Sequence, residues 1–405
     1  YLGIHLGLIS VVTTRDELAS VMAHELSHVT QRHISRSMGD QARMTPWLIG
    51  AMILGMLAAS KSAQGAQAMI VGGQAMAAQS QLNFSRDMER EADRIGYGVM
   101  SEAGFDTLGF VTMFGKLQQA AGLNDSGSFP YLRSHPLSSE RMADMQSRQQ
   151  LQTPRPANLE SDLIQAMMSS RARVLAQPGV DALRAWANEA ADTHIDKQVL
   201  TKRMGVLYGA ALSWMQLRDM KQARALIPRM QQAAGDHATA LRLIRLFESE
   251  LAFKEDDMRA ALRALSATAS LANRQWPRPE LIALAQASAR LHATSSSVET
   301  AQLLANSIAA LQALVLQNPQ DAQAWQVLAT ALAAQGRPLA SLRAEGEVQI
   351  ARMDFGAAVD RFRAAQDASR RGPAQMGDHI EASIVDARLR FAQSIFREQM
   401  LERDR

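Results

Sequence analysis

The spacing of apolar residues predicts helices along most of the chain. The exception is the first segment, residues 1–12, where apolar residues alternate and favour a strand. After it, the capping-box pattern Thr14-Arg15-Asp16-Glu17 opens a helix that is expected to run to about Met38 and to end at Gly39. The pattern therefore predicts one short strand followed by a long helix.

A second strong helix is predicted from about Arg86 to Ala103. Gly104 follows it and is expected to end it. Its buried stripe consists of apolar residues three or four positions apart, namely Met88, Ala92, Ile95 and Val99. A third helix is expected over about residues 107–121 and a shorter one from near Ser139. The first 150 residues therefore read as a domain built mainly from helices.

Beyond a proline-containing linker at residues 150–157, one helical pattern follows another. The turn Arg352-Met353-Asp354-Phe355 and the small residues after it are typical of the second helix of a tetratricopeptide repeat. Gly346 is expected where the first helix of that unit crosses the second. The turn Leu217-Arg218-Asp219-Met220 repeats the pattern more loosely. We therefore expect an α-solenoid of tetratricopeptide repeats over residues 158–405.

Composition supports a mainly α fold, because helix formers are abundant and only 5% of residues are aromatic. The net charge of +3 and the absence of basic stretches argue against a nucleic-acid partner. Without cysteine there are no disulfides and no thiolate ligands for zinc. The apolar stretch at residues 47–59 is too short for an ordinary transmembrane helix. It is core, a cover over a cleft, or a membrane-surface helix, which would give the protein peripheral membrane contact.

The segment His24-Glu25-Leu26-Ser27-His28 has the His-Glu-x-x-His pattern and lies inside the predicted long helix. Residues four apart share one helix face, so both imidazoles can bind one zinc ion. Glu25 then faces the water at the metal and can act as general base in peptide hydrolysis. The pattern predicts a zinc-dependent peptidase site.

A catalytic zinc site needs a third protein ligand. Glu89 and Asp93 lie on one face of the second predicted helix, so Glu89 can bind the metal while Asp93 accepts the free ring N–H of a ligand histidine. Glu91 lies about 200° around the helix from Glu89 and is expected to face solvent. His33 lies off the ligand face and is expected to be a surface residue.

Three motifs in this order resemble the zinc endopeptidase family that includes the CAAX prenyl-protein proteases. They are the His24–His28 segment, Glu89-Arg-Glu-Ala-Asp93, and Ser134-His135-Pro136 with Arg141 five residues after the proline. The resemblance implies a gluzincin-type peptidase domain, made of helices with a small β-sheet, over residues 1–150. Members of the family normally begin earlier, so the N-terminal part of this domain is expected to be missing.

The resemblance also implies roles for the site residues. His24, His28 and Glu89 would be the ligands of one zinc ion, and Asp93 would support a ligand histidine. His135 would be a fourth ligand in a closed state or would stabilise the oxyanion. Arg141 would anchor the loop of His135 by pairing with an acidic site residue.

Tetratricopeptide repeats after the peptidase unit narrow the resemblance to periplasmic members that assist outer-membrane β-barrel assembly in Gram-negative bacteria. It implies a zinc metalloendopeptidase that cuts misfolded or misassembled outer-membrane and periplasmic proteins. The repeats would recruit these substrates or the β-barrel assembly machinery. The alternative is a chaperone or scaffold whose repeats bind protein and whose zinc site is latent and self-inhibited.

Overall fold

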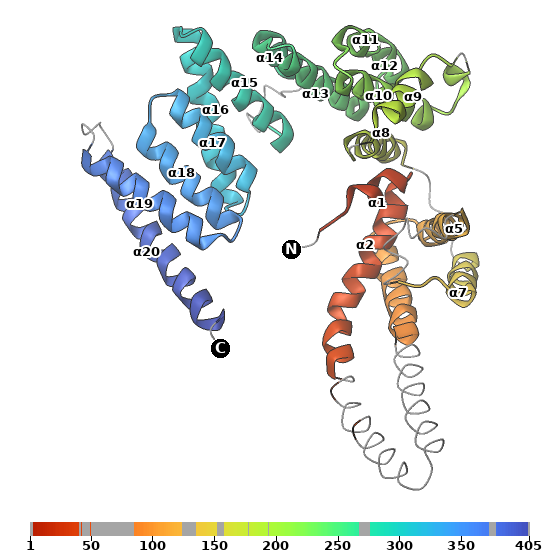
Figure 1. The fold of residues 1–405 in the computed structure, drawn as a ribbon. Helices are drawn as coiled ribbons and strands as arrows, with labels where there is room; N and C mark the ends of the chain where they lie inside the picture. Colours follow the sequence, from red (N-terminus) through yellow and green to blue (C-terminus); the bar gives the residue numbers. More distant parts are fainter. Residues whose placement is uncertain are drawn as a thin grey trace. The chain divides into compact units, whose positions relative to one another are not determined.

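The computed structural model describes residues 3–39, 42, 49, 85–123, 135–151, 158–176, 178–192, 194–266, 276–371 and 378–403. Within these ranges the regular structure is helical and includes no strand, which confirms the mainly α fold (Figure 1). The apolar stretch at residues 47–59 and most of the predicted linker lie outside the described residues.

Two compact units divide the chain, and each is described by itself. The first contains residues 1–182 and 189–209, and the second contains residues 183–188 and 210–405. The first unit runs past the limit predicted at residue 150 because α8 (Leu159–Leu175) packs on α1 (Leu6–Val11). The domain limits at 1–150 and 158–405 remain a prediction.

The strand expected at residues 1–12 is wrong, because residues 6–11 of this segment form α1. The His5 Nδ1 atom caps the helix by accepting a hydrogen bond from the Gly7 N–H over 3.1 Å. Side chains of α8 bind the carbonyls at the end of α1: Gln165 donates to the Val12 oxygen over 3.1 Å and Ser169 to the Ser10 oxygen over 2.9 Å. The backbone groups of this segment thus find partners without a neighbouring strand.

Helix α2 (Arg15–Thr30) begins as predicted with a reciprocal capping box between Thr14 and Glu17. It ends earlier than expected, because the backbone turns at Gln31 and at Arg32, which has φ of +54°. A second short helix follows over residues 33–39. The single long helix to Met38 is therefore wrong, and the break changes the direction of the chain just after the His24–His28 segment.

The helix of residues 85–102 ends as predicted at Gly104, which has φ of +86°. Its buried face differs from the predicted stripe at the C-terminal end: Val99 is 36% exposed, whereas Met100 is buried. Gly96 accounts for the position of this buried face. A Cβ atom there would lie 3.0 Å from the carbonyl carbon of Ala23. The helix therefore packs backbone to backbone against α2.

Two further helices complete the first unit around the site. Helix α5 (Leu108–Leu123) packs on α2, and α7 (Ser139–Gln150), capped by Ser138, packs on α5. Their shared core is a cluster of large apolar side chains that includes Tyr97, Met100, Phe110, Met113, Leu117 and Met145. This cluster fixes the positions of the helices that carry the candidate site.

In the second unit the described helices form successive antiparallel hairpins. Four turns share one geometry, in which a residue with positive φ is followed by an N–H that donates to the carbonyl five residues earlier. The positive-φ residues are Arg218, Asp256, Gly336 and Met353. This is the Schellman arrangement that ends a helix and reverses the chain. The predicted turns at Arg218 and Met353 are confirmed, and the identity of the units as tetratricopeptide repeats remains a prediction.

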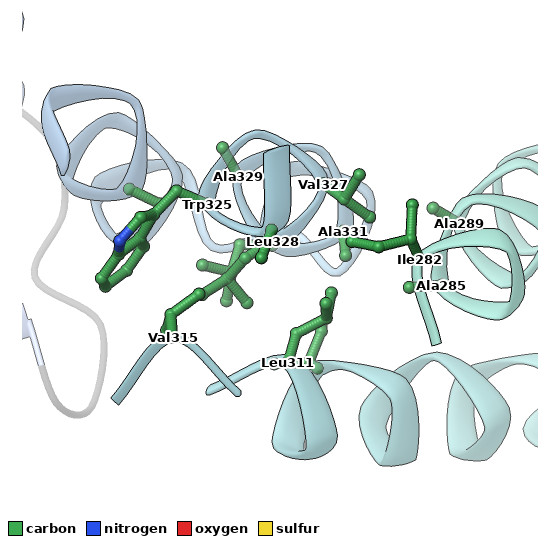
Figure 2. Packing of buried hydrophobic residues seen from close by; sticks show 14 of the residues in the cluster. Ile282, Ala285, Ala289, Leu311, Val315, Trp325, Val327, Leu328, Ala329 and Ala331 are labelled. Atoms are coloured by element: carbon green, nitrogen blue, oxygen red, sulfur yellow. The ribbon is translucent and has the colours of Figure 1, made fainter. Parts of the chain in front are cut away.

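The bounds of the remaining helices are as follows: α9 (Val180–Glu189), the 3-10 helix η1 (Ile195–Lys197), α10 (Leu200–Gln216), α11 (Met220–Ala225), α12 (Ile227–Ala234), α13 (Ala238–Lys254), α14 (Met258–Ser266), α15 (Arg278–Thr294), α16 (Val298–Gln317), α17 (Ala322–Ala334), α18 (Pro338–Ala351), α19 (Phe355–Arg371) and α20 (Asp378–Arg403). Helix α16 is the described helix that is long and apolar enough to cross a membrane. Its buried side chains, Leu311 and Val315 among them, pack with α15 and α17 in one core (Figure 2), as core helices of soluble proteins also do.

Small residues set the distance between paired helices of this unit. A Cβ atom at Gly346 on α18 would overlap the ring of Phe362 on α19. Phe362 is fully buried. The expectation that Gly346 lies at the close crossing of its helix pair is confirmed.

Candidate metal centre

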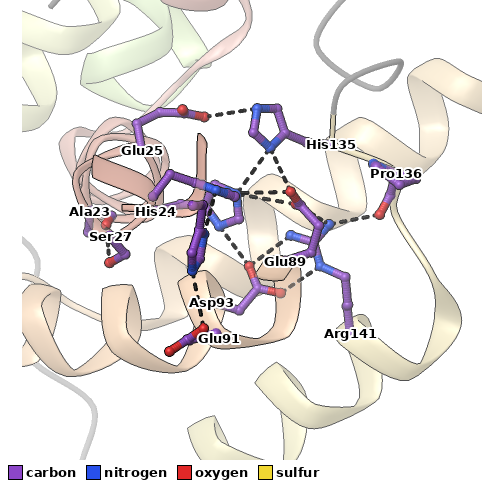
Figure 3. Close-up of polar contacts among 12 residues, drawn as sticks. Ala23, His24, Glu25, Ser27, Glu89, Glu91, Asp93, His135, Pro136 and Arg141 are labelled. Atoms are coloured by element: carbon purple, nitrogen blue, oxygen red, sulfur yellow. Dashed lines mark hydrogen bonds and ion pairs between the residues drawn. The ribbon is translucent and has the colours of Figure 1, made fainter. Parts of the chain in front are cut away.

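Three separate segments bring the candidate site together (Figure 3). Helix α2 supplies His24, Glu25 and His28, and the helix of residues 85–102 supplies Glu89. His135 comes from the segment that precedes α7. One ligand atom from each of His24, His28, Glu89 and His135 can be chosen so that all four lie within 4.8 Å of one another.

Distances within this cluster suit a shared ion. The Nε2 atoms of His24 and His28 lie 3.0 Å apart, and each lies 3.4 Å from an oxygen of Glu89. The Nδ1 atom of His135 lies 3.0 Å from Glu89 and 3.4 Å from the His24 Nε2 atom. Imidazole nitrogens and a carboxylate oxygen are ligands that zinc takes in catalytic sites, so the donor set fits this metal. The ligand roles of these residues remain predictions.

Glu25 lies at the open side of the cluster. Its side chain is 29% exposed, and its Oε1 atom lies 3.5 Å from the Nε2 atom of His135. Two residues on, on the other face of the helix, Ser27 is buried and donates to the Ala23 carbonyl. A carboxylate in this place can reach both the cluster and an approaching substrate.

Asp93 and Arg141 form the buried base of the site. The Asp93 Oδ1 atom lies 2.9 Å from the Nδ1 atom of His24, on the side of the ring that faces away from the cluster. Arg141 donates to both oxygens of Asp93 over 2.6 and 2.8 Å, to the Pro136 carbonyl over 2.8 Å, and lies 2.9 Å from Glu89. One guanidinium thus connects the Asp93 and Glu89 carboxylates to the segment that carries His135.

The charges of the metal-free site are strongly coupled. Burial lowers the pKa of His24, but the hydrogen bonds and charges of Asp93 and Glu89 outweigh burial and raise the pKa to about 9. Burial raises the pKa of the Glu89 carboxyl, and its histidine neighbours overcome this and lower the pKa below the ordinary range. The pKa of Asp93 is lowered as well, against burial, by Arg141 and His24. A bound cation would therefore replace a proton in a site that already favours positive charge.

Two residues next to the site are not where the sequence pattern suggested. His33 was expected at the surface, but it is 2% exposed and its Nδ1 atom lies 2.8 Å from the Nδ1 atom of His28. Glu91 was expected to face solvent, but its side chain is 27% exposed and contacts both His33 and Arg36. Both residues meet at the helix of residues 33–39, which begins after the break at Arg32 and whose His33 and Arg36 contact Glu91. The sequence signal that could have revealed the contact of His33 is its position, five residues after His28.

Residues 1–149 match the sequence profile of peptidase family M48. The matched segment is an M48 domain by sequence. The resemblance to this group of zinc peptidases is therefore confirmed, and the His24–His28 segment, Glu89 and His135 all lie within the M48 domain.

Similarity to characterised proteins extends past the M48 domain. The chain is 32% identical over 247 residues to the beta-barrel assembly-enhancing protease of Escherichia coli, covering 59% of this chain and 48% of that protein. It is 32% identical over 236 residues to the beta-barrel assembly-enhancing protease of Yersinia pestis, covering 58% and 47%. It is 29% identical over 136 residues to the mitochondrial metalloendopeptidase OMA1 of Schizosaccharomyces pombe, covering 34% and 37%. The chain spans about half the length of the two bacterial relatives.

Proposed function

We propose that the chain is a zinc-dependent endopeptidase that hydrolyses peptide bonds in misfolded or misassembled outer-membrane and periplasmic proteins. The observation that carries the proposal is the four-residue cluster of His24, His28, Glu89 and His135, with Glu25 beside it, inside an M48 domain. When bound, zinc supplies Lewis acidity, which acidifies a water molecule and polarises a peptide carbonyl.

The proposed roles follow from where each side chain lies. His24, His28 and Glu89 hold the ion, and Asp93 orients His24 by accepting its Nδ1–H. Glu25 accepts the proton of the attacking water and returns it to the leaving amine. Water and the scissile peptide approach from the side of Glu25, whose side chain is 29% exposed.

His135 has two proposed states. With its Nδ1 atom 3.0 Å from Glu89 and 3.4 Å from His24, it is close enough to act as a fourth ligand and fill the position that a catalytic site keeps open. Displaced by substrate, its ring can donate a hydrogen bond to the oxyanion. Arg141 anchors the loop of His135, because it pairs with Asp93 and donates a hydrogen bond to the Pro136 carbonyl.

The names of the bacterial relatives support a role in outer-membrane β-barrel assembly, and therefore a periplasmic location for this chain. We propose that the helical hairpins of the second unit are tetratricopeptide repeats that recruit the substrate or the β-barrel assembly machinery. A concave surface made by such repeats is suited to extended protein segments.

The experiment compares cleavage of an unfolded outer-membrane β-barrel protein by the zinc-loaded wild type and by Glu25→Gln. Loss of the general base is expected to slow cleavage by about 10²–10⁴-fold. Glu102→Gln is the matched control, because Glu102 is an exposed carboxylate on the helix that carries Glu89. This variant should cut the substrate at the wild-type rate. Equal cleavage by wild type and Glu25→Gln would refute the proposal.

The contacts of His135 also favour a second function, that of a chaperone with a latent, self-inhibited site. In that case the wild type binds the unfolded substrate without cutting it, and His135→Ala releases proteolysis. Unchanged proteolysis in His135→Ala would count against inhibition by this residue.

A further inference from the structure

His28 makes a contact through each of its ring nitrogens. Its Nε2 atom faces the cluster, 3.0 Å from His24 and 3.4 Å from Glu89. Its Nδ1 atom faces the opposite way and lies 2.8 Å from the Nδ1 atom of His33. The sequence motif does not include His33, so the second contact of His28 has no assigned purpose.

The contact continues beyond His33 to a fixed negative charge. The Nε2 atom of His33 lies 3.2 Å from Glu91 Oε2, and Arg36 Nη1 lies 2.8 Å from the same oxygen. Figure 3 shows Glu91 on the side of the site away from His135. The Oε2 atom of Glu91 is thus shared by Arg36 and His33, and Glu91 is the acceptor at the end of a row of two imidazoles.

Hydrogen bonding selects one arrangement of protons along this row. An imidazole that binds a metal through Nε2 must carry its proton on Nδ1, so His28 is the donor to His33. The Nδ1 atom of His33 is then the acceptor, which places the proton of His33 on Nε2, where it is donated to Glu91. With the opposite arrangement, His28 would carry its proton on Nε2 and offer no lone pair to the metal.

We propose that His33, oriented by Glu91, is a positioning residue that holds His28 with an unprotonated Nε2 atom directed at the zinc ion. This inference rests on the proposed zinc function of the site. The other ligand histidine, His24, has a comparable partner. Its Nδ1 atom contacts Asp93, a carboxylate held in place by Arg141. His28 differs in that an imidazole stands between the ligand and its carboxylate.

Burial makes this contact consequential. His33 is 2% exposed, so little water can replace it as the acceptor for His28. Loss of the partner that orients a ligand histidine typically weakens metal binding by about 10–100-fold. The expected effect is on zinc affinity, since His33 itself has no contact with the substrate side of Glu25 among the described residues.

The test measures zinc affinity by competition with a chromophoric chelator, in a Glu25→Gln background that prevents self-cleavage. His33→Phe keeps a ring but removes the acceptor, and is expected to weaken zinc binding by about 10–100-fold. His33→Asn places an amide oxygen where Nδ1 stood, and is expected to lose less than about tenfold. The proposal would be overturned if His33→Phe bound zinc as tightly as the wild type. It would also be overturned if His33→Asn bound zinc no more tightly than His33→Phe.

Two controls separate this inference from the zinc function on which it rests. His194→Gln removes an exposed histidine paired with Asp192 and should not change zinc affinity. His28→Ala should abolish tight binding of one ion. If the wild type does not bind zinc or His28→Ala binds as tightly, the zinc function itself fails. If only His33→Phe is without effect, the positioning role alone fails.

A direct measurement avoids substitutions that unfold the protein. Imidazole ¹⁵N NMR of the zinc-loaded wild type should show His28 protonated at Nδ1 and His33 protonated at Nε2. The proton on the His28 Nδ1 atom should exchange slowly with water, because its acceptor His33 is buried. A His33 ring protonated at Nδ1 and not at Nε2 would overturn the proposal even if every variant failed to fold.

Discussion

Replacing Arg141 with methionine should strongly destabilise the first unit in its metal-free form. The guanidinium donates to both oxygens of Asp93 over 2.6 and 2.8 Å and lies 2.9 Å from Glu89. Asp93 and Glu89 are 1% and 3% exposed, so neither carboxylate can recover its contacts from water. Removing one partner from a buried ion pair costs about 3–5 kcal/mol, and we expect a loss of this size.

An exposed arginine on the same helix provides the matched control. Arg148 pairs with Asp144 at 2.9 Å, and the two side chains are 36% and 49% exposed. Such a surface pair contributes about 0.2–1 kcal/mol, so Arg148→Met should change stability little. In both variants methionine keeps an apolar stem, and the difference between them isolates the buried charge.

Hydrogen exchange is the appropriate assay, because a global unfolding curve would mix the two units of the chain. The free energy of opening for amides in α7 and in the helix of residues 85–102 reports on the first unit alone. Arg141→Met should lower it by several kcal/mol relative to Arg148→Met. A difference smaller than about 1 kcal/mol, the size of an ordinary surface substitution, would refute the reasoning.

Three further predictions follow from close contacts and charge. Gly96→Ala should cost about 1–3 kcal/mol and weaken zinc binding, because its Cβ would lie 3.0 Å from the backbone of α2. Gly98→Ala has open space and should stabilise the helix by about 0.5–1 kcal/mol. Hydrogen exchange of amides in the first unit measures both changes in stability, and chelator competition measures zinc binding. Because neighbouring carboxylates raise the pKa of His24 from 6.5 to about 9, protonated His24 stabilises the metal-free protein fully below pH 6.5, and this contribution is lost as pH rises through about 9. Zinc must displace that proton, so apparent affinity should rise about tenfold per pH unit up to about pH 9, and a flat titration would contradict this. Gly346→Ala should destabilise the second unit by about 1–3 kcal/mol through overlap with Phe362, and adding Phe362→Leu should restore part of the loss in tryptophan-detected urea unfolding.

Local patterns gave the parts of the fold that depend on neighbouring residues. The capping box at Thr14 and Glu17, the helix end at Gly104 and the turn at Met353 each follow from residues within a few positions of one another. The His-Glu-x-x-His spacing is also local, since one helix face decides it. These features were therefore accessible from the sequence.

The parts that failed depend on contacts between distant segments. Residues 6–11 form a helix because α8, about 150 positions later, donates hydrogen bonds from Gln165 and Ser169 to the carbonyls at its end. The break at Arg32 needs a left-handed residue that is not glycine, and no local pattern predicts one there. His33 therefore contacts His28, and the residue spacing of one continuous helix does not predict this contact.

The candidate ligands come from segments far apart in the chain, with 111 positions between His24 and His135 and 46 between Glu89 and His135. No short stretch of the polypeptide carries a complete site. A chain whose helices have not yet docked therefore lacks the assembled cluster of His24, His28, Glu89 and His135. The proposed peptidase activity accordingly requires the folded first unit.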